Sequence, residues 1–145
     1  MPKVVGSFDA SGSPVVTISI SSANEASPPV RVFDAVIDTG FTGFLQMPTQ
    51  EANGLGIVAR TSGDVEYADG RIRAVPLAWA RVALGEATEE GFIHLHDATS
   101  EVTVGLEFLR TFRKALVLSV TDHWVLLIDS VAELFPEGPG SYRPV

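Results

Sequence analysis

The segment from residue 35 to residue 45, Ala-Val-Ile-Asp-Thr-Gly-Phe-Thr-Gly-Phe-Leu, constrains the fold more than any other part of the chain. Three apolar residues, two of them β-branched, lead directly into Asp38, which indicates a buried strand that ends in a tight turn. A carboxylate in such a place is costly unless a partner pairs with it or a reaction uses it. Gly40 and Gly43 supply the backbone freedom to double back beside Asp38. The segment therefore predicts a strand whose terminal carboxylate has a specific role.

Length and composition limit the remaining possibilities. The 145 residues predict one domain, at 1–135, followed by a tail at 136–145 that is rich in proline and glycine. The net charge of −8 argues against nucleic acid or an anionic membrane as a partner. The absence of cysteine excludes a disulfide scaffold, a zinc site with Cys ligands and a thiol nucleophile. No segment approaches the roughly 18 apolar residues of a membrane span, so we expect a cytoplasmic protein.

The rest of the chain is typical of β-strands separated by turns. A polar loop at 21–29 precedes the strand that leads to Asp38, and a short helix is expected within 46–55, near Pro48. Alternating and β-branched patterns predict further strands at 3–8, 14–20, 30–37, 57–67, 71–84, 86–96, 114–120 and 124–128.

The strand, the Asp-Thr-Gly sequence and the glycine-rich turn together resemble the catalytic loop of aspartic proteases. A single copy in a short chain resembles the retropepsin branch, and Asp-Thr-Gly-Phe-Thr-Gly is similar to its prokaryotic single-domain members. The resemblance implies that Asp38 is catalytic, that Thr39 locks the loop by hydrogen bonding across a pair of such loops, and that Gly40 lets the backbone approach closely. The alternative is an ordinary turn, since this tripeptide is common in all-β proteins.

A second motif, Val-Thr-Val-Gly-Leu-Glu-Phe-Leu at 102–109, strengthens the resemblance. In the family, a strand ending in two apolar residues and a glycine runs beside the catalytic loop and turns into a short helix. The viral members have an Arg where this chain has Leu106, and they pair it with an Asp where this chain has Thr42. Both halves of the ion pair are therefore missing together. Phe41 replaces a small residue beside the catalytic glycine, and we expect it to narrow the cleft or alter its specificity.

A hairpin turn at Asp69 and Gly70 bears on function, because a retropepsin-like chain has its flap at this point after the catalytic loop. Tyr67, Ala68, Asp69 and Gly70 resemble the Tyr-x-Thr-Gly flap tip of pepsin-type enzymes, with Asp in place of Thr. A flap closes over the substrate and excludes water from the cleft. The alternative is a plain surface hairpin, since Asp-Gly turns are common.

Two further groups of residues have spacings that chemistry could use. Asp129-Ser130-Val131 has the position of a second catalytic loop, but Val131 stands where glycine is required, so we do not expect a second catalytic aspartate in the chain. His94 and His96 lie on one face of a predicted strand at a spacing that zinc can use. No third ligand is evident in the sequence nearby, and solvent-facing histidines are the commoner explanation.

These observations predict an all-β fold, a closed and mostly antiparallel barrel of a single lobe with one or two short helices. The resemblance implies an aspartic endopeptidase that needs no cofactor and no metal. Because the chain supplies one catalytic aspartate, the site is expected at the two-fold interface of a homodimer, with peptides or proteins as substrates. Two alternatives stay open: a non-catalytic dimeric peptide-binding module with Phe41 plugging the cleft, and a zinc hydrolase built on His94 and His96.

Overall fold

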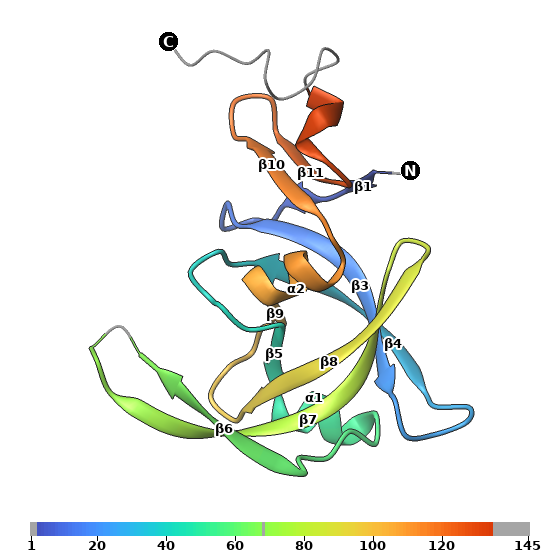
Figure 1. Cartoon of the computed structure of the whole chain (residues 1–145), viewed down its shortest axis with the longest axis vertical. Coiled ribbons are helices and arrows are strands. Elements are labelled where there is room, and N and C mark those ends of the chain that lie inside the picture. The colour runs from blue at the N-terminus through green and yellow to red at the C-terminus, as the bar shows by residue number, and fades with distance from the viewer. Residues whose placement is uncertain (1–2, 68, 135–145) are drawn as a thin grey trace.

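The computed structural model describes residues 3–67 and 69–134 (Figure 1). Ala68 and the segment 135–145, which contains the predicted tail, lie outside the described residues. The described part is mostly β-strand with two short α-helices. None of its helices has the length and apolar character needed to cross a membrane.

Six strands close into a barrel, as the sequence predicted. In order around the barrel they are β3 (Pro14–Ser22), β4 (Val30–Ile37), β9 (Thr103–Val104), β5 (Leu45–Pro48), β8 (Ala87–His96) and β7 (Ile72–Leu84), and pairing of β3 with β7 closes the ring. The β4–β9 and β5–β8 pairs are parallel, and the other four are antiparallel.

The core fills the barrel because successive side chains of a strand point to opposite faces. In β3 the inward set is Val16, Ile18 and Ile20, each at most 2% exposed. In β4 the corresponding residues are Ala35 and Ile37. The inward face of β4 thus ends immediately before Asp38. The packing of Ile37 in the barrel therefore fixes the position in the chain at which Asp38 follows.

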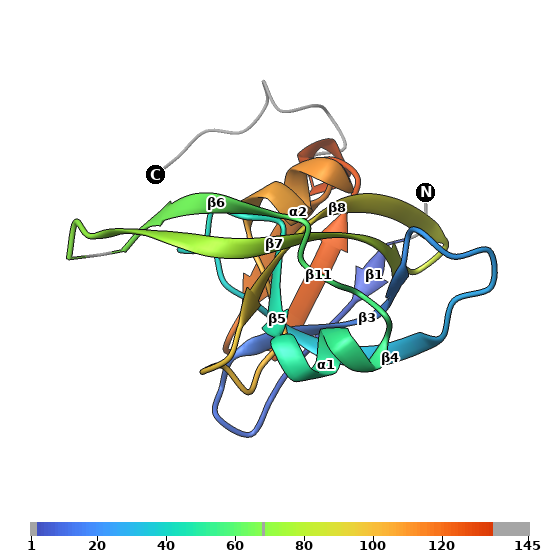
Figure 2. The same ribbon diagram turned by 90° about the horizontal axis from the view of Figure 1, so that it is seen from below.

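A second, three-stranded sheet packs against the barrel (Figures 1 and 2). It consists of β1 (Val4–Val5), β11 (Trp124–Ile128) and β10 (Ala115–Ser119), in that order. The predicted strand at 3–8 is divided, since Gly6 separates β1 from β2 (Ser7–Phe8), which belongs to the barrel sheet. The Gly6 amide donates to the Val125 carbonyl over 2.8 Å, and a Cβ at Gly6 would lie 2.9 Å from Cγ1 of Val125. Only glycine lets the chain pass between the sheets here.

The short helix expected near Pro48 is present, but the residues before it form a strand that the sequence did not predict. Residues 45–48 form β5, and helix α1 covers only Thr49–Gly54. The β5 strand pairs with β8 on one side and β9 on the other, and it buries Leu45 and Met47 completely. Pairing with distant strands and burial in the core therefore outweigh the weak local preference of this segment.

Of the remaining elements, helix α2 and the hairpin were predicted, with a shorter first strand in the hairpin, whereas the 3₁₀ turn was not. Helix α2 (Leu106–Thr111) directly follows β9 and buries Phe108 in the core, while a 3₁₀ turn at Val131–Leu134 ends the described chain. The predicted hairpin at 57–84 is β6 (Thr61–Glu66) paired with β7, and it projects from the barrel in both views (Figures 1 and 2).

An ion pair joins the two ends of the β10–β11 hairpin. Lys114, whose side chain is 6% exposed, pairs with Oδ1 of Asp129. The other oxygen, Oδ2, is buried and accepts no hydrogen bond from the described residues. Asp129 therefore has a structural partner, which accords with the expectation that it is not a second catalytic aspartate.

Replacing Lys114 alone should lower the free energy of unfolding much more than replacing both Lys114 and Asp129. Lys114→Met leaves a largely buried carboxylate without its cation and should lower the free energy of unfolding by about 3 kcal/mol. The double variant Lys114→Met/Asp129→Leu removes the uncompensated charge and should recover most of that loss. Urea unfolding of the four proteins of this cycle measures both effects. Equal destabilisation of the single and double variants would contradict the assignment.

Candidate active site

The loop that carries Asp38 is fixed by backbone hydrogen bonds. The Asp38 amide donates to the Val104 carbonyl over 2.9 Å, and the Phe41 amide donates to the Asp38 carbonyl over 3.1 Å, which closes the turn. Oδ1 of Asp38 accepts a hydrogen bond of 2.9 Å from the Gly40 amide. The loop itself therefore sets the orientation of the carboxylate.

The Asp38 carboxylate is exposed in the single chain, although Ala35 and Ile37 at the end of the preceding strand are buried. Thr39 and Gly40 are exposed as well, and among the described residues the Thr39 side chain makes no hydrogen bond. The sequence pattern led us to expect a costly buried charge, and for the single chain this is wrong. The burial of the strand stops at Ile37 because the next three residues leave the barrel wall.

Gly40 and Gly43 are required for space, and their dihedral angles need no glycine. The glycines with positive φ among the described residues are at positions 12, 56, 70 and 85. A Cβ at Gly40 would lie 3.1 Å from Oδ1 of Asp38, so glycine permits the amide to approach the carboxylate. A Cβ at Gly43 would lie 2.5 Å from Cζ of Phe41. The close approach of the backbone predicted at Gly40 is present. Neither Gly40 nor Gly43 has a positive φ angle, so the backbone freedom predicted for them is not used.

The second motif lies beside the Asp38 loop, as predicted. Strand β9 runs parallel to β4, with Val104 opposite Ile37, and helix α2 starts next to the loop. The Leu106 amide donates to the Phe41 carbonyl over 2.9 Å, and the Glu107 amide donates to the carbonyls of Thr42 and Gly43 over 3.2 Å each. Backbone amides at the start of α2 thus hold the loop, without an ion pair between the positions of Thr42 and Leu106.

The Phe41 ring packs against the body of the protein. It meets the imidazole of His94 edge to face, with ring centroids 5.2 Å apart and an interplanar angle of 80°. It also lies over Gly43 and over Gly105, where a Cβ would come within 2.7 Å of its Cδ2. Phe41 does not line the cavity that contains Asp38. The single chain therefore does not bring the Phe41 ring together with Asp38 in one cavity.

Asp38 and Thr39 line an open cavity of about 380 Å³. Much of its wall is apolar and comes from β4 and β10, with Leu116 and Leu118 contributed by β10. The sequence analysis did not assign these two leucines to the site. Their alternating positions marked a strand, but nothing local indicated that this strand would lie beside Asp38. The other lining residues are Ser13, Pro14, Val36, Ile37, Glu101 and Thr103.

The predicted hairpin turn is present next to residue 68. Gly70 has φ of 81°, and its amide donates to the Tyr67 carbonyl over 2.9 Å. Oδ1 of Asp69 accepts a hydrogen bond of 3.0 Å from the Arg71 amide. The Arg73 guanidinium lies 5.6 Å from the centre of the Tyr67 ring. The hairpin is confirmed for the described residues, whereas its role as a flap stays a prediction.

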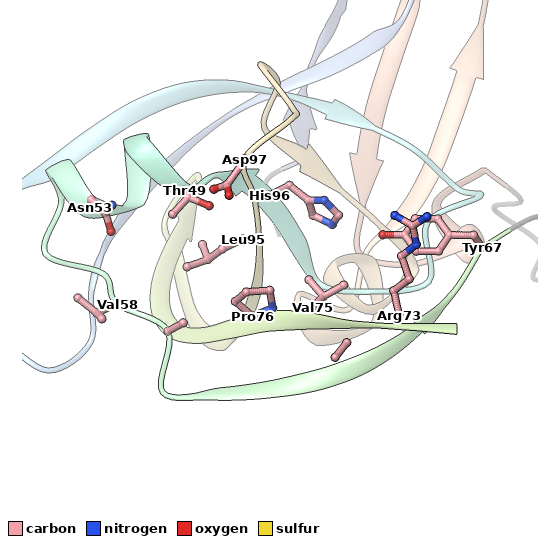
Figure 3. A pocket seen from close by; sticks show the side chains of 12 residues that line it. Thr49, Asn53, Val58, Tyr67, Arg73, Val75, Pro76, Leu95, His96 and Asp97 are labelled. Atoms are coloured by element: carbon pink, nitrogen blue, oxygen red, sulfur yellow. The ribbon is translucent and has the colours of Figure 1, made fainter. Parts of the chain in front are cut away.

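A larger cavity, of about 480 Å³, lies between the β6–β7 hairpin, helix α1 and the end of β8 (Figure 3). Figure 3 shows Tyr67 and Arg73 at one end of this cavity and Asn53 at the other. Asp38 is not among its lining residues. The structure of the single chain therefore places Tyr67 and Asp38 in different cavities.

The two histidines of β8 face different surroundings. His94 is half-buried against Phe41, and burial, followed by the proximity of His96, lowers its pKa. His96 lines the cavity of Figure 3, whereas His94 lines a separate cavity with Glu90 and Glu107. Within residues 3–67 and 69–134, no three His, Asp or Glu side chains come together in a way that could hold a metal ion. The described residues thus offer no third ligand for the alternative zinc site.

Comparison with known proteins identifies the fold. No protein-family model matches the sequence, and no curated protein matches it significantly. A solved structure of a retropepsin-like aspartic protease from Rickettsia conorii superposes with a TM-score of 0.57 at 12% identity, over 87% of this chain and 90% of that one. EIAV protease in complex with the inhibitor HBY-793 superposes with a TM-score of 0.54 at 16% identity, over 77% of this chain and 98% of that one. The chain therefore has a retropepsin-like fold with a single lobe.

Proposed function

We propose that the protein is an aspartic endopeptidase whose active site contains Asp38 from each of two chains. The observation that carries the proposal is the geometry of Asp38, an exposed carboxylate at the end of a barrel strand, oriented by the Gly40 amide and bordering a cavity. The retropepsin-like fold supports it, since the structures similar to this chain include a retropepsin-like aspartic protease and a protease in complex with an inhibitor.

A second carboxylate is needed because one cannot both accept and donate a proton in the same step. Two carboxylates about 3 Å apart cannot both ionise near neutral pH, so the pair holds one proton, as is known for aspartic proteases. The other aspartate that follows an apolar strand, Asp129, is paired with Lys114. A two-fold axis beside the exposed Asp38 would supply the partner carboxylate from a second chain.

The pair would then perform acid–base hydrolysis. A water molecule held between the carboxylates loses a proton to the ionised one while its oxygen attacks the peptide carbonyl carbon. The protonated carboxylate gives its proton to the carbonyl oxygen, which forms a tetrahedral diol. The carboxylate that took the water proton then gives it to the nitrogen, while the other carboxylate takes a proton from a hydroxyl of the diol. The C–N bond breaks, an acid and an amine leave, and the pair returns to its original state.

The edge of β10 is the surface best suited to join the two chains. Any axis that brings two Asp38 carboxylates together passes close to β10, since Leu116 and Leu118 line the cavity of Asp38. Strand β10 is at the end of the order β1-β11-β10, so its outer edge has no strand partner among the described residues. Antiparallel pairing of β10 with its copy is self-complementary, as two-fold symmetry requires.

The substrate class follows from the same surfaces. The cavity at Asp38 has apolar walls from Val36, Leu116 and Leu118, which favours apolar side chains on the substrate. The projecting β6–β7 hairpin offers backbone groups that can pair with an extended peptide, as in strand addition. Extended peptides or unfolded protein segments are therefore the proposed substrates.

Asp38→Asn should abolish cleavage of an unfolded protein substrate. An amide cannot accept the proton from water, so we expect a loss of about 100- to 10,000-fold in kcat/KM, with the melting temperature nearly unchanged. The matched control is Asp34→Asn, the same change at another exposed position of the same chain segment, which should keep its activity. Full activity in a clean Asp38→Asn preparation would sink the protease assignment. Peptide binding without cleavage by the unaltered protein would instead favour the non-catalytic module.

Activity should depend on dimer formation. Specific activity is expected to fall on dilution, in parallel with the dimer fraction measured by sedimentation. In a two-fold dimer, Leu118→Lys places one new positive charge from each chain in the proposed interface. The dimer dissociation constant should therefore rise by about 100-fold. Val30→Lys is the control, since Val30 is similarly exposed at the far end of β4 and should leave the dimer intact. Constant specific activity in a sample that sediments as a monomer would falsify the shared site.

A further inference from the structure

The Phe41 ring connects three elements around the Asp38 loop. It lies on Gly43 within the loop, on Gly105 at the start of α2, and against His94 of β8. A Cβ at Gly43 would come within 2.5 Å of the ring atom Cζ and 2.7 Å of Cε1. Such distances leave no room for even a methyl group. Gly43 and the ring are therefore matched, while at Gly105 a Cβ would meet the carbonyl oxygens of Phe41 and Gly43, at 2.2 and 2.5 Å, as well as the ring.

The backbone of the same residue joins the turn to the helix. The Phe41 amide donates to the Asp38 carbonyl, and the Phe41 carbonyl accepts the Leu106 amide. A shift of the Phe41 backbone, which the packing of the ring opposes, would thus move both the hydrogen bond that closes the Asp38 turn and the one that anchors it to α2. The position of the ring and the position of the carboxylate are coupled through one residue.

Phe44, the last residue of the loop, anchors its β5 end, since its ring centroid lies 5.7 Å from that of Phe108 in α2 and 6.4 Å from that of Phe112. Thr42 and Leu106 carry no charge, and no ion pair among the described residues links the loop to α2. The contact between Phe41 and His94 is an edge-to-face aromatic pair, an arrangement with a specific geometry as well as buried area. At the end of the loop nearer Asp38, the Phe41 ring is therefore the side chain that packs the loop against Gly105 and His94.

We propose that Phe41 is a positioning residue, whose ring acts as a wedge between Gly43, Gly105 and His94 and fixes the Asp38 carboxylate for catalysis. This role differs from narrowing the cleft, since the ring does not line the cavity of Asp38. The catalytic consequence rests on the proposed function, whereas the effect on the loop does not. Phe41 itself is not expected to touch the water or the peptide.

A cycle of variants tests the wedge. Phe41→Ala should lower kcat by about 10- to 100-fold with little change in KM, because a misplaced carboxylate impairs the reaction more than binding. Gly43→Ala should also lower kcat, since its methyl group would displace the ring. In the double variant the methyl group enters the space that the ring has left, so Gly43→Ala should add little further loss. Strictly additive losses would overturn the proposal.

Two substitutions at His94 provide a second test, because one removes the aromatic contact with Phe41 and the other keeps it. His94→Ala removes one wall of the ring's site and should lower kcat, whereas His94→Phe keeps an aromatic wall and should retain most of it. The control is Phe92→Ala on the same strand, which removes a ring that is 47% exposed and that packs on Trp79, whereas the Phe41 ring packs on His94. A loss of kcat in Phe92→Ala equal to that in Phe41→Ala would point to general destabilisation and overturn the specific role of Phe41.

Hydrogen exchange separates this inference from the protease assignment. In Phe41→Ala the amides of Asp38, Leu106 and Glu107 should exchange at least about tenfold faster, while amides in the β7–β8 pair keep their protection. This result is expected even if the unaltered protein cleaves no peptide, in which case the proposed function fails and the wedge stands. Unchanged exchange at these three amides, with full activity, would leave the protease intact and remove the wedge.

Discussion

The candidate site depends on the parallel pairing of β4 with β9. The amides of Val36 and Asp38 donate to the carbonyls of Val102 and Val104, each over 2.9 Å, and these bonds join parts of the chain that are far apart in sequence. Parallel strands cannot be joined by a tight turn and need a long crossover. Here the crossover contains β5, β6, β7 and β8. The barrel is thus both the core of the protein and the connection that brings α2 to the Asp38 loop.

The sequence predicted those parts of the fold that local pattern controls. The strand before Asp38, the turn at Gly70 and the strand-to-helix step at Gly105 are encoded by residues within a few positions of each other. Strand β5 was missed because it exists through its pairing with β8 and β9, and pairing over such distances leaves little trace in a short segment. The direction of the Phe41 ring was not predictable either, since a tight turn has no periodicity that assigns side chains to a face.

Asp38 and Asp129 illustrate how surroundings decide the role of a carboxylate. Both follow an apolar strand that ends in isoleucine, and the next residue is Thr or Ser. Asp129 meets a nearly buried lysine from the start of β10, whereas Asp38 meets only a glycine amide of its own loop and remains exposed. Neither partner follows from the shared pattern. The glycine at position 40 and the valine at position 131 were the only local signs of the difference.

The small sheet has a consequence for the order of events during protein synthesis. Strand β1, near the N-terminus, finds its partner only in β11, the last strand of the described chain. A ribosome therefore releases all six barrel strands before β1 and β10 acquire their common neighbour. If chains pair through β10 as proposed, the small sheet that supports the joining edge is completed only once β11 has been synthesised, later than all six barrel strands. A chain that has not yet reached β11 would then have a complete barrel but not the completed sheet through which the proposed shared site forms.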